Sequence, residues 1–281
     1  MASLLKEGSM TTHPAISIVI PAYNESERIS ATLSKVQRAI RQYHWDAEII
    51  VVDDGSTDDT VEIVNGFRAT ANSDKFFRQP IEINLVEVTP NKGKGFSVRA
   101  GMLRARGNIV LFTDADLSAP IDEARSLFDA IQAGADIAIG SRWLDVNRQA
   151  QRQPLYRQFF GRCFNQAVRL AMDLPYADTQ CGFKAFTRIA AHVVSELQTI
   201  ERWGFDPEIL FIARERGFRV KEVPVTWAHD SRSKISYLRD GVRMLRDMAV
   251  IRGRALLGRY SRQVRPCEPI PIRSKGILYG D

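Results

Sequence analysis

Two carboxylates with a spacing suited to a shared cation lie near the middle of the chain, at Asp114 and Asp116. They follow an apolar, β-favouring run at 109–113, which predicts a buried strand. Alternate side chains of extended backbone point the same way, so both carboxylates can face one cation. The opposing interpretation is a plain turn, because Asp is common where strands end and Pro120 follows soon after. Taken alone, the pair leaves a metal site and a turn equally open.

A second pair of carboxylates, Asp53 and Asp54, ends another apolar run at 48–52. If both runs are parallel strands of one sheet, their carboxyl ends lie at the same edge, which is the usual ligand edge of an open α/β fold. Hard oxygen ligands of this kind suit Mg²⁺ or Mn²⁺ held together with a diphosphate. The segment 91–95, Asn-Lys-Gly-Lys-Gly, adds two lysine cations and two glycines that let a phosphate approach the backbone.

The elements that position these residues alternate along the first half of the chain. Short β-branched runs and amphipathic stretches follow one another with short connections, which predicts an α/β fold with a mostly parallel sheet flanked by helices. The expected strands are 16–20, 48–52, 81–88, 109–113 and 135–140, and the expected helices are 26–43, 59–68, 91–106 and 121–133. Glu25 or Ser26 is expected to cap the first helix.

The pattern changes after residue 141, where polar loops separate the predicted elements. Helices are expected at 155–172, 188–197, 205–216 and 235–257, with a short strand inside 178–186 and a strand at 220–227. Pro224 places that last strand at a sheet edge or a bulge. The expected division is a flexible N-terminus (1–14), one α/β domain (15–230), a basic amphipathic helical region (231–258) and a mobile tail (259–281).

Composition limits the class of protein. The 281 residues are 44% apolar and 26% charged, as expected of a globular protein, and no apolar run is long enough to span a membrane. The three cysteines are odd in number and widely spaced, which suits a reducing cytoplasm rather than a disulfide framework. The net charge of +6 is concentrated in the basic stretch 232–265. That stretch indicates an anionic partner or, alternatively, a solvated helix face.

Two other classes of nucleotide-dependent enzyme fit less well. Gly93 and Gly95 begin a dinucleotide-binding pattern, but its sixth position is Val98 and it lies on the third βα unit. A nucleotidyltransferase should carry a Gly-rich, Arg-containing loop after its first strand. Here the first strand is followed by Pro-Ala-Tyr-Asn-Glu at 21–25.

Several motifs, in order, resemble one enzyme family. The segments 18–25, 51–58, 91–95 and 114–120 resemble family 2 glycosyltransferases, which have the GT-A (Rossmann-like) fold. The segments 140–142, 178–184 and 232–236 narrow the resemblance to polyprenyl- and dolichyl-phosphate hexosyltransferases. The wording of segments 91–95 and 114–120 most resembles the dolichyl-phosphate β-glucosyltransferase type. The resemblance covers roughly residues 16–245.

The resemblance implies a role for particular residues. It implies a nucleotide-sugar site made of Pro21, Tyr23, Glu25, Asp54, Lys92, Asp114, Ala115 and Lys234. It implies metal binding by Asp114 and Asp116, acceptor-phosphate binding by Arg142 and Arg157, and catalytic roles for Asp116, Asp178 and Arg232. Ser118 departs from members that carry a stronger ligand at that position.

The expected reaction is an inverting, Mg²⁺- or Mn²⁺-dependent transfer of a hexose, glucose from UDP-glucose, to polyprenyl or dolichyl phosphate. GDP-mannose as donor and a non-lipid acceptor are the alternatives. A lipid acceptor requires access to a bilayer, so we expect a cytoplasmic, peripheral enzyme at the inner face of the cell membrane. Its basic helix, with apolar positions at 238, 242, 245, 249 and 256, would bind the membrane surface. Nucleic acid is not an expected partner.

Overall fold

The computed structural model describes residues 13–71, 81–145, 165–228 and 237–264. Of the predicted site residues, Arg157, Arg232 and Lys234 lie outside these ranges, as do most of the predicted N-terminal segment and tail. The strands are β1 (Ile16–Ala22), β2 (Ala47–Asp53), β3 (Glu82–Glu87), β4 (Ile109–Thr113), β5 (Ile137–Ser141), β6 (Phe183–Thr187) and β7 (Val220–Pro224). The helices are α1 (Ile29–Gln42), α2 (Thr60–Ala71), α3 (Lys94–Arg104), the short 3₁₀ helix η1 (Ile121–Glu123), α4 (Ala124–Gln132), α6 (Arg188–Leu197), α7 (Phe205–Glu215) and α8 (Tyr237–Leu256), and residues 165–172 are also helical.

The described strands form one sheet in the order β3-β2-β1-β4-β6-β5-β7. β1 pairs in parallel with β2 and β4, and β2 pairs in parallel with β3. The loops that leave these four strands therefore meet at one edge, which we call the carboxyl edge. The predicted mostly parallel sheet is confirmed, and β7, which ends at Pro224, lies at the sheet edge as that proline indicated.

The sequence did not predict the direction of one strand, β6. β6 lies between β4 and β5 and is antiparallel to both. It enters the sheet from the carboxyl edge, so the segment just before it, which contains Gly182, lies beside the end of β4. This insertion brings residues of the second half of the chain against Asp114.

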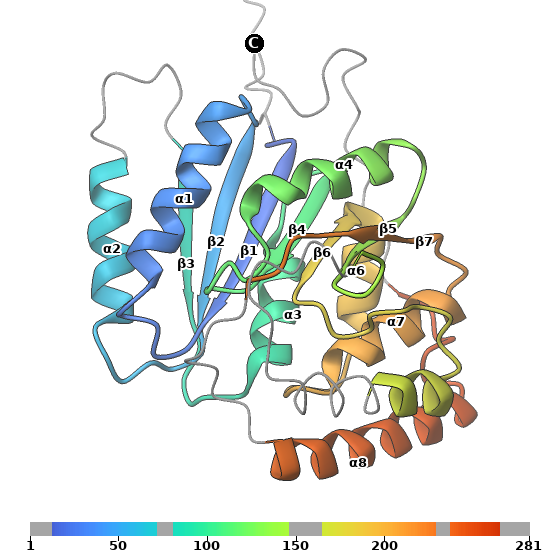
Figure 1. Ribbon diagram of the computed structural model, residues 1–281. Coiled ribbons are helices and arrows are strands. Elements are labelled where there is room, and N and C mark those ends of the chain that lie inside the picture. The colour runs from blue at the N-terminus through green and yellow to red at the C-terminus, as the bar shows by residue number, and fades with distance from the viewer. Residues whose placement is uncertain (1–12, 72–80, 146–164, 229–236, 265–281) are drawn as a thin grey trace, which may run out of the picture.

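Helices cover both faces of the sheet, as Figure 1 shows. On one face, side chains of α1, α2 and α4 pack against alternate strand residues such as Ile18 and Leu111. On the other face, α3, α6 and α7 pack against the intervening residues, such as Val19 and Phe112. α8 lies along α7, where Met248 and Ile251 are buried. Burial on both faces explains why the central strands are almost continuously apolar.

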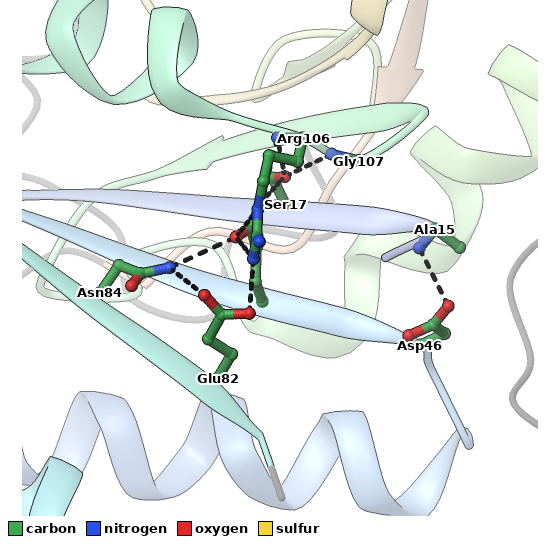
Figure 2. Close-up of polar contacts among 8 residues, drawn as sticks. Ala15, Ser17, Asp46, Glu82, Asn84, Arg106 and Gly107 are labelled. Atoms are coloured by element: carbon green, nitrogen blue, oxygen red, sulfur yellow. Dashed lines mark hydrogen bonds and ion pairs between the residues drawn. The ribbon is translucent and has the colours of Figure 1, made fainter. Parts of the chain in front are cut away.

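The opposite edge of the sheet, which we call the amino edge, holds a closed polar cluster (Figure 2). Glu48 is 1% exposed and accepts hydrogen bonds from the Ser17 hydroxyl (2.6 Å) and from the Arg106 guanidinium (2.6 and 3.0 Å). Arg106 also pairs with Glu82 at 2.5 Å. The cluster ties β1, β2 and β3 to the end of α3, and the buried charge is matched by donors.

The predicted cap of the first helix is wrong. α1 begins at Ile29 with Arg28 as its N-cap, and no side chain caps it. The Glu25 carboxylate instead accepts from the Arg28 guanidinium. The Ser26 N–H donates to Asp58 at 3.1 Å, which ties the β1–α1 loop to the β2–α2 loop. These tertiary contacts outweigh the local capping preference.

Candidate active site

Asp114 and Asp116 lie where β4 ends, on a tight turn. The Leu117 N–H donates to the Asp114 carbonyl at 3.1 Å, and Leu117 has a positive φ of 47°. The Asp116 carboxylate accepts from the Ser118 N–H at 2.9 Å. The backbone is therefore a turn rather than the extended segment we expected, yet the turn still brings the carboxylates together. Burial and the charge of Asp114 raise the pKa of Asp116.

Lys94, the first residue of α3, is paired with Asp114. Its Nζ lies 2.6 Å from Asp114 Oδ1 and within 6 Å of the rings of Phe112, Trp203 and Phe205. Burial lowers the pKa of Lys94, but the charges of Asp114, Asp206 and Asp116 outweigh that effect, and the net pKa is raised. Lys94 is thus a fixed cation beside the carboxylate pair. It also lies near the N-terminus of α3, a position that favours anions.

Asp54 holds the loop that carries these lysines. Its carboxylate accepts from the side chain of Asn91 (2.8 Å) and from the N–H groups of Lys92 (2.9 Å) and Gly93 (2.7 Å). Gly93 has a φ of 113°, and a Cβ there would lie 2.6 Å from the Glu201 carbonyl oxygen. The geometry makes Asp54 the anchor of the 91–95 loop, with Lys92 held through its own backbone.

A third loop, 21–25, completes the carboxyl edge on the side of β1. Pro21 is still part of β1, whereas Tyr23 follows that strand and is 39% exposed. The Glu25 N–H donates to the Thr60 hydroxyl at 2.8 Å, and the Asn24 N–H donates to the Ser56 hydroxyl at 2.8 Å. These bonds fix the loop against the β2–α2 loop and leave the Tyr23 ring accessible from solvent.

Arg142 and Asp178 form one unit beside this edge. Asp178 is fully buried and accepts from Arg142 Nε (2.7 Å), Nη2 (2.8 Å) and the Arg142 N–H (3.0 Å). The guanidinium carbon also lies 4.9 Å from the centre of the Trp227 ring. Burial would raise the pKa of Asp178, but the adjacent Arg142 outweighs it and holds that pKa below its ordinary value.

A second buried ion pair joins Lys184 and Asp206, and the sequence did not predict that these two residues pair. Lys184 on β6 is fully buried, and its Nζ lies 2.5 Å from both Asp206 Oδ1 and the Cys181 carbonyl oxygen. Gly182 is in direct contact with Asp114, because a Cβ added to Gly182 would lie 2.0 Å from Asp114 Oδ2. No spacing signal in the sequence connects residues 182–206 with Asp114, since only the antiparallel entry of β6 joins them.

The chemistry of the carboxylate pair fits a divalent cation. Two carboxylates held against their mutual repulsion would be relieved by a cation between them. Within the described ranges, no group of three or more His, Cys, Asp or Glu side chains is arranged to hold a metal. Asp114 and Asp116 would therefore bind a cation together with oxygens of a ligand, as is usual for Mg²⁺ with a diphosphate. The cationic Lys94 beside them suits the same diphosphate.

α8 contributes a basic, partly apolar surface. Leu245 (52%), Leu256 (90%) and Leu257 (74%) are exposed on or just after it, and Arg243 and Arg246 are exposed among them. In the part of the chain that the structure describes, no helix combines the length and apolar content that crossing a bilayer requires.

Comparison with known proteins gives the family. Residues 17–194 match the family described as Glycosyl transferase family 2. A Trichomonas vaginalis protein named dolichyl-phosphate beta-glucosyltransferase is 42% identical over 231 residues, which cover 78% of this chain and 66% of that protein. A Saccharomyces cerevisiae protein of the same name is 33% identical over 260 residues, which cover 87% of this chain and 76% of that protein.

A solved structure gives the same fold. Glucosyl-3-phosphoglycerate synthase from Mycobacterium tuberculosis, crystallised with UDP, superposes with a TM-score of 0.58 at 20% identity, covering 90% of this chain and 82% of that one. That likeness concerns the fold alone. With the family match and the carboxyl-edge geometry, it shows that this chain belongs to glycosyl transferase family 2 and has the GT-A fold.

Proposed function

We propose that the protein transfers glucose from UDP-glucose to a polyprenyl or dolichyl phosphate, with inversion at the anomeric carbon. The observation that carries the proposal is the carboxylate pair Asp114 and Asp116 beside Lys94, at the edge where four parallel strands end. The names of the relatives at 33–42% identity support the sugar and the lipid phosphate. GDP-mannose as donor, and a non-lipid acceptor, are the alternatives that the test must separate.

The donor diphosphate is bound by charge at the carboxyl edge. Lys94 supplies positive charge, and Asp54 anchors the 91–95 loop that carries it by accepting from the N–H groups of Lys92 and Gly93. Pro21, Tyr23 and Glu25, in the loop that is bonded to the start of α2, would hold the nucleoside, and Ala115 lies between the two carboxylates in the sequence. A divalent Mg²⁺ or Mn²⁺ held by Asp114 and Asp116 would supply further stabilisation of the charge that develops on the leaving UDP.

The acceptor needs orientation more than deprotonation. A phosphate monoester already carries negative charge near neutral pH, since its second pKa is about 6. Asp178 has a lowered pKa and accepts three hydrogen bonds from Arg142, which makes it a weak proton acceptor. We therefore assign Asp178 to holding Arg142, and Arg142 to orienting the acceptor phosphate for in-line attack on the anomeric carbon.

The test is a donor competition. The purified protein is incubated in parallel with labelled UDP-glucose and labelled GDP-mannose, each with polyprenyl phosphate and Mg²⁺ or Mn²⁺, and the lipid-extractable label is counted. Label from UDP-glucose, lost on chelation and in Asp116→Asn but kept in the surface control Asp129→Asn, is the expected result. Label from GDP-mannose instead supports the alternative donor. Label from neither donor, beside an active control enzyme, refutes lipid transfer.

We also propose that the protein reaches its acceptor from a membrane surface through α8. The exposed leucines at 245, 256 and 257 would enter the headgroup region, and the arginines around them would contact anionic lipids. Figure 1 shows α8 at one extremity of the fold, along α7. The location that we propose is the cytoplasmic face of the membrane.

Vesicle flotation tests the membrane contact. The wild-type protein should float with anionic vesicles and much less with neutral ones. The double variant Leu256→Ser/Leu257→Ser should lose most of that binding, whereas Ile189→Ser, which changes a 49% exposed apolar residue on α6, should retain it. Equal flotation of the double variant and the wild-type protein would exclude this surface.

A further inference from the structure

A fully buried carboxylate, Glu208 on α7, lies outside the site described above. It accepts hydrogen bonds from the N–H groups of Thr199 (3.0 Å) and Ile200 (2.7 Å) and from the Thr199 hydroxyl (2.6 Å). The hydroxyl of Tyr260 donates to the same carboxylate at 2.8 Å. A buried charge is tolerated only with partners of this number and quality, so Glu208 sets the position of each group that it binds.

The segment that Glu208 holds is the support of the Lys94 loop. Gln198 Nε2 donates to the Gly95 carbonyl at 2.8 Å, and the Phe96 N–H donates to the Glu201 carbonyl at 2.9 Å. A Cβ on Gly95 would lie 2.6 Å from the Ile200 carbonyl oxygen, so the two segments are in contact without free space. A shift of segment 198–203 would therefore move Lys94 relative to Asp114.

Tyr260 connects this support to the chain that follows α8. Its side chain is 1% exposed, and its ring packs edge-on against Phe211 with centroids 5.9 Å apart. Packing of the ring therefore fixes the position of the Tyr260 hydroxyl that donates to Glu208. α8 itself reaches the same segment, because a Cβ on Gly204 would lie 2.4 Å from Asp247 Oδ2.

We propose that Glu208 and Tyr260 are positioning residues that hold Lys94 in place for the donor diphosphate. Tyr260, which follows α8, thereby contributes to donor binding through Glu208. The inference rests on the proposed function for the identity of the donor, but the physical link from Tyr260 to Lys94 can be measured without it. A hydrogen bond to a charged group is strong enough for its loss to change donor affinity measurably.

Tyr260→Phe is the sharpest variant, because it keeps the ring against Phe211 and removes only the hydroxyl. Tyr43→Phe is the matched control, since the Tyr43 hydroxyl also donates to a carboxylate, Asp122, at 2.8 Å but near the surface. We expect Tyr260→Phe to raise the KM for UDP-glucose and the Kd for UDP with Mn²⁺ about tenfold, with the acceptor KM unchanged. A lowered kcat with both KM values unchanged would indicate a merely structural role and overturn the inference.

A double variant tests the order of the link. If the Tyr260 hydroxyl acts through Glu208, Tyr260→Phe should add little to the rise in KM that Glu208→Gln causes alone. Fully additive effects would contradict a shared route through the carboxylate.

Amide hydrogen exchange provides the readout that needs no activity. Tyr260→Phe should accelerate exchange in peptides covering 91–97 and 198–204, whereas Tyr43→Phe should not. If exchange changes as expected while the wild-type protein transfers no glucose, the positioning stands and the assigned reaction is wrong. If the wild-type protein is active and Tyr260→Phe matches Tyr43→Phe in both KM and exchange, the positioning is refuted and the reaction stands. An inactive wild-type protein with unchanged exchange refutes both.

Discussion

The two edges of the sheet both carry acidic side chains, but the partners of these carboxylates differ between the edges. At the amino edge, Glu48 accepts from Ser17 and from two guanidinium nitrogens of Arg106, and Arg106 is shared with Glu82 (Figure 2). At the carboxyl edge, Asp116 accepts from the backbone of Ser118, and burial together with the charge of Asp114 raises its pKa. The amino edge matches Glu48 with donors, whereas at the carboxyl edge Lys94 pairs with Asp114, and burial and the charge of Asp114 still raise the pKa of Asp116.

The difference separates a structural cluster from a binding site. A buried carboxylate with matched donors contributes to holding strands together, and breaking it costs stability. A carboxylate held near another carboxylate costs stability until a cation arrives, and perturbed pKa values of this kind concentrate at functional sites. Neutralising one residue at each edge should therefore give opposite results.

The largest effect is expected for Asp116→Asn. The substitution removes a charge from the donor site, so kcat/KM should fall by about 10²- to 10³-fold, as for other groups that stabilise charge in a transition state. The melting temperature at neutral pH should rise, because repulsion with Asp114 is removed. Transfer kinetics and thermal unfolding measure the two effects, and a loss of activity explained by a falling melting temperature would contradict the comparison.

Glu48→Gln should give the converse result. Removing the charge weakens the hydrogen bonds that the buried Glu48 side chain accepts from Ser17 and from the partly exposed Arg106 guanidinium, which should lower the free energy of unfolding by about 2 kcal/mol. The kcat/KM of the folded fraction should not change. Denaturant unfolding and transfer assays at a temperature well below melting check this. An unchanged free energy of unfolding would show that the amino-edge cluster does not stabilise the sheet.

Gly182→Ala tests the carboxyl edge in a second way, because it displaces the Asp114 carboxylate without removing its charge. The new Cβ would lie 2.0 Å from Asp114 Oδ2, so the Asp114 side chain must rotate away from its place beside Lys94. We expect kcat/KM to fall about 10- to 100-fold, since small misplacements of catalytic groups have effects of this order.

Gly66→Ala is the matched control for that glycine substitution, because a Cβ at Gly66 in α2 meets nothing within 4 Å. It should leave activity unchanged and raise stability slightly, as glycine is unfavourable inside a helix. Equal activities of the two alanine variants would show that Asp114 tolerates displacement.

Local sequence patterns were sufficient for the parallel half of this fold but not for the contacts that complete the site. The apolar runs at 48–52 and 109–113 predicted β2 and β4, and the carboxylates after them predicted the ligand edge. The antiparallel direction of β6 depends on the route of the chain rather than on the composition of Phe183–Thr187. The contact of Gly182 with Asp114 follows from that route, so no spacing rule could supply it.

Capping preferences failed for a related reason. Glu25 has the right type and position to interact with the start of α1, but its carboxylate pairs with Arg28, and the neighbouring backbone bonds to the β2–α2 loop. Buried ion pairs such as Lys184 with Asp206 were likewise hidden, because their partners are far apart in the sequence. Sequence reasoning found the residues that resemble a known site, including Asp54 and Asp178, but it did not predict the Lys184–Asp206 pair or the contact of Gly182 with Asp114.

The smallest expected effect is a pH dependence of stability at the carboxyl edge. The folded-state pKa of Asp116 is raised above its unfolded value, so the folded protein binds this proton more tightly than the unfolded chain does. Asp116 therefore costs stability once pH rises above its raised pKa, and the cost vanishes at pH values below the unfolded pKa. Asp116→Asn should accordingly melt higher than the wild-type protein at neutral pH, by an amount that shrinks as the pH is lowered.

Glu82 at the amino edge should change the pH dependence of the melting temperature in the opposite direction, because its pKa is lowered rather than raised. Burial would raise its pKa, but the Arg106 partner outweighs burial and lowers it, so Glu82 stabilises the fold above its unfolded pKa. Glu82→Gln should melt lower than the wild-type protein at neutral pH, and this deficit should shrink as the pH falls through the lowered pKa. Melting curves of both variants across acidic and neutral pH test the pair. Differences of the same sign would mean that the two edges do not handle charge in opposite ways.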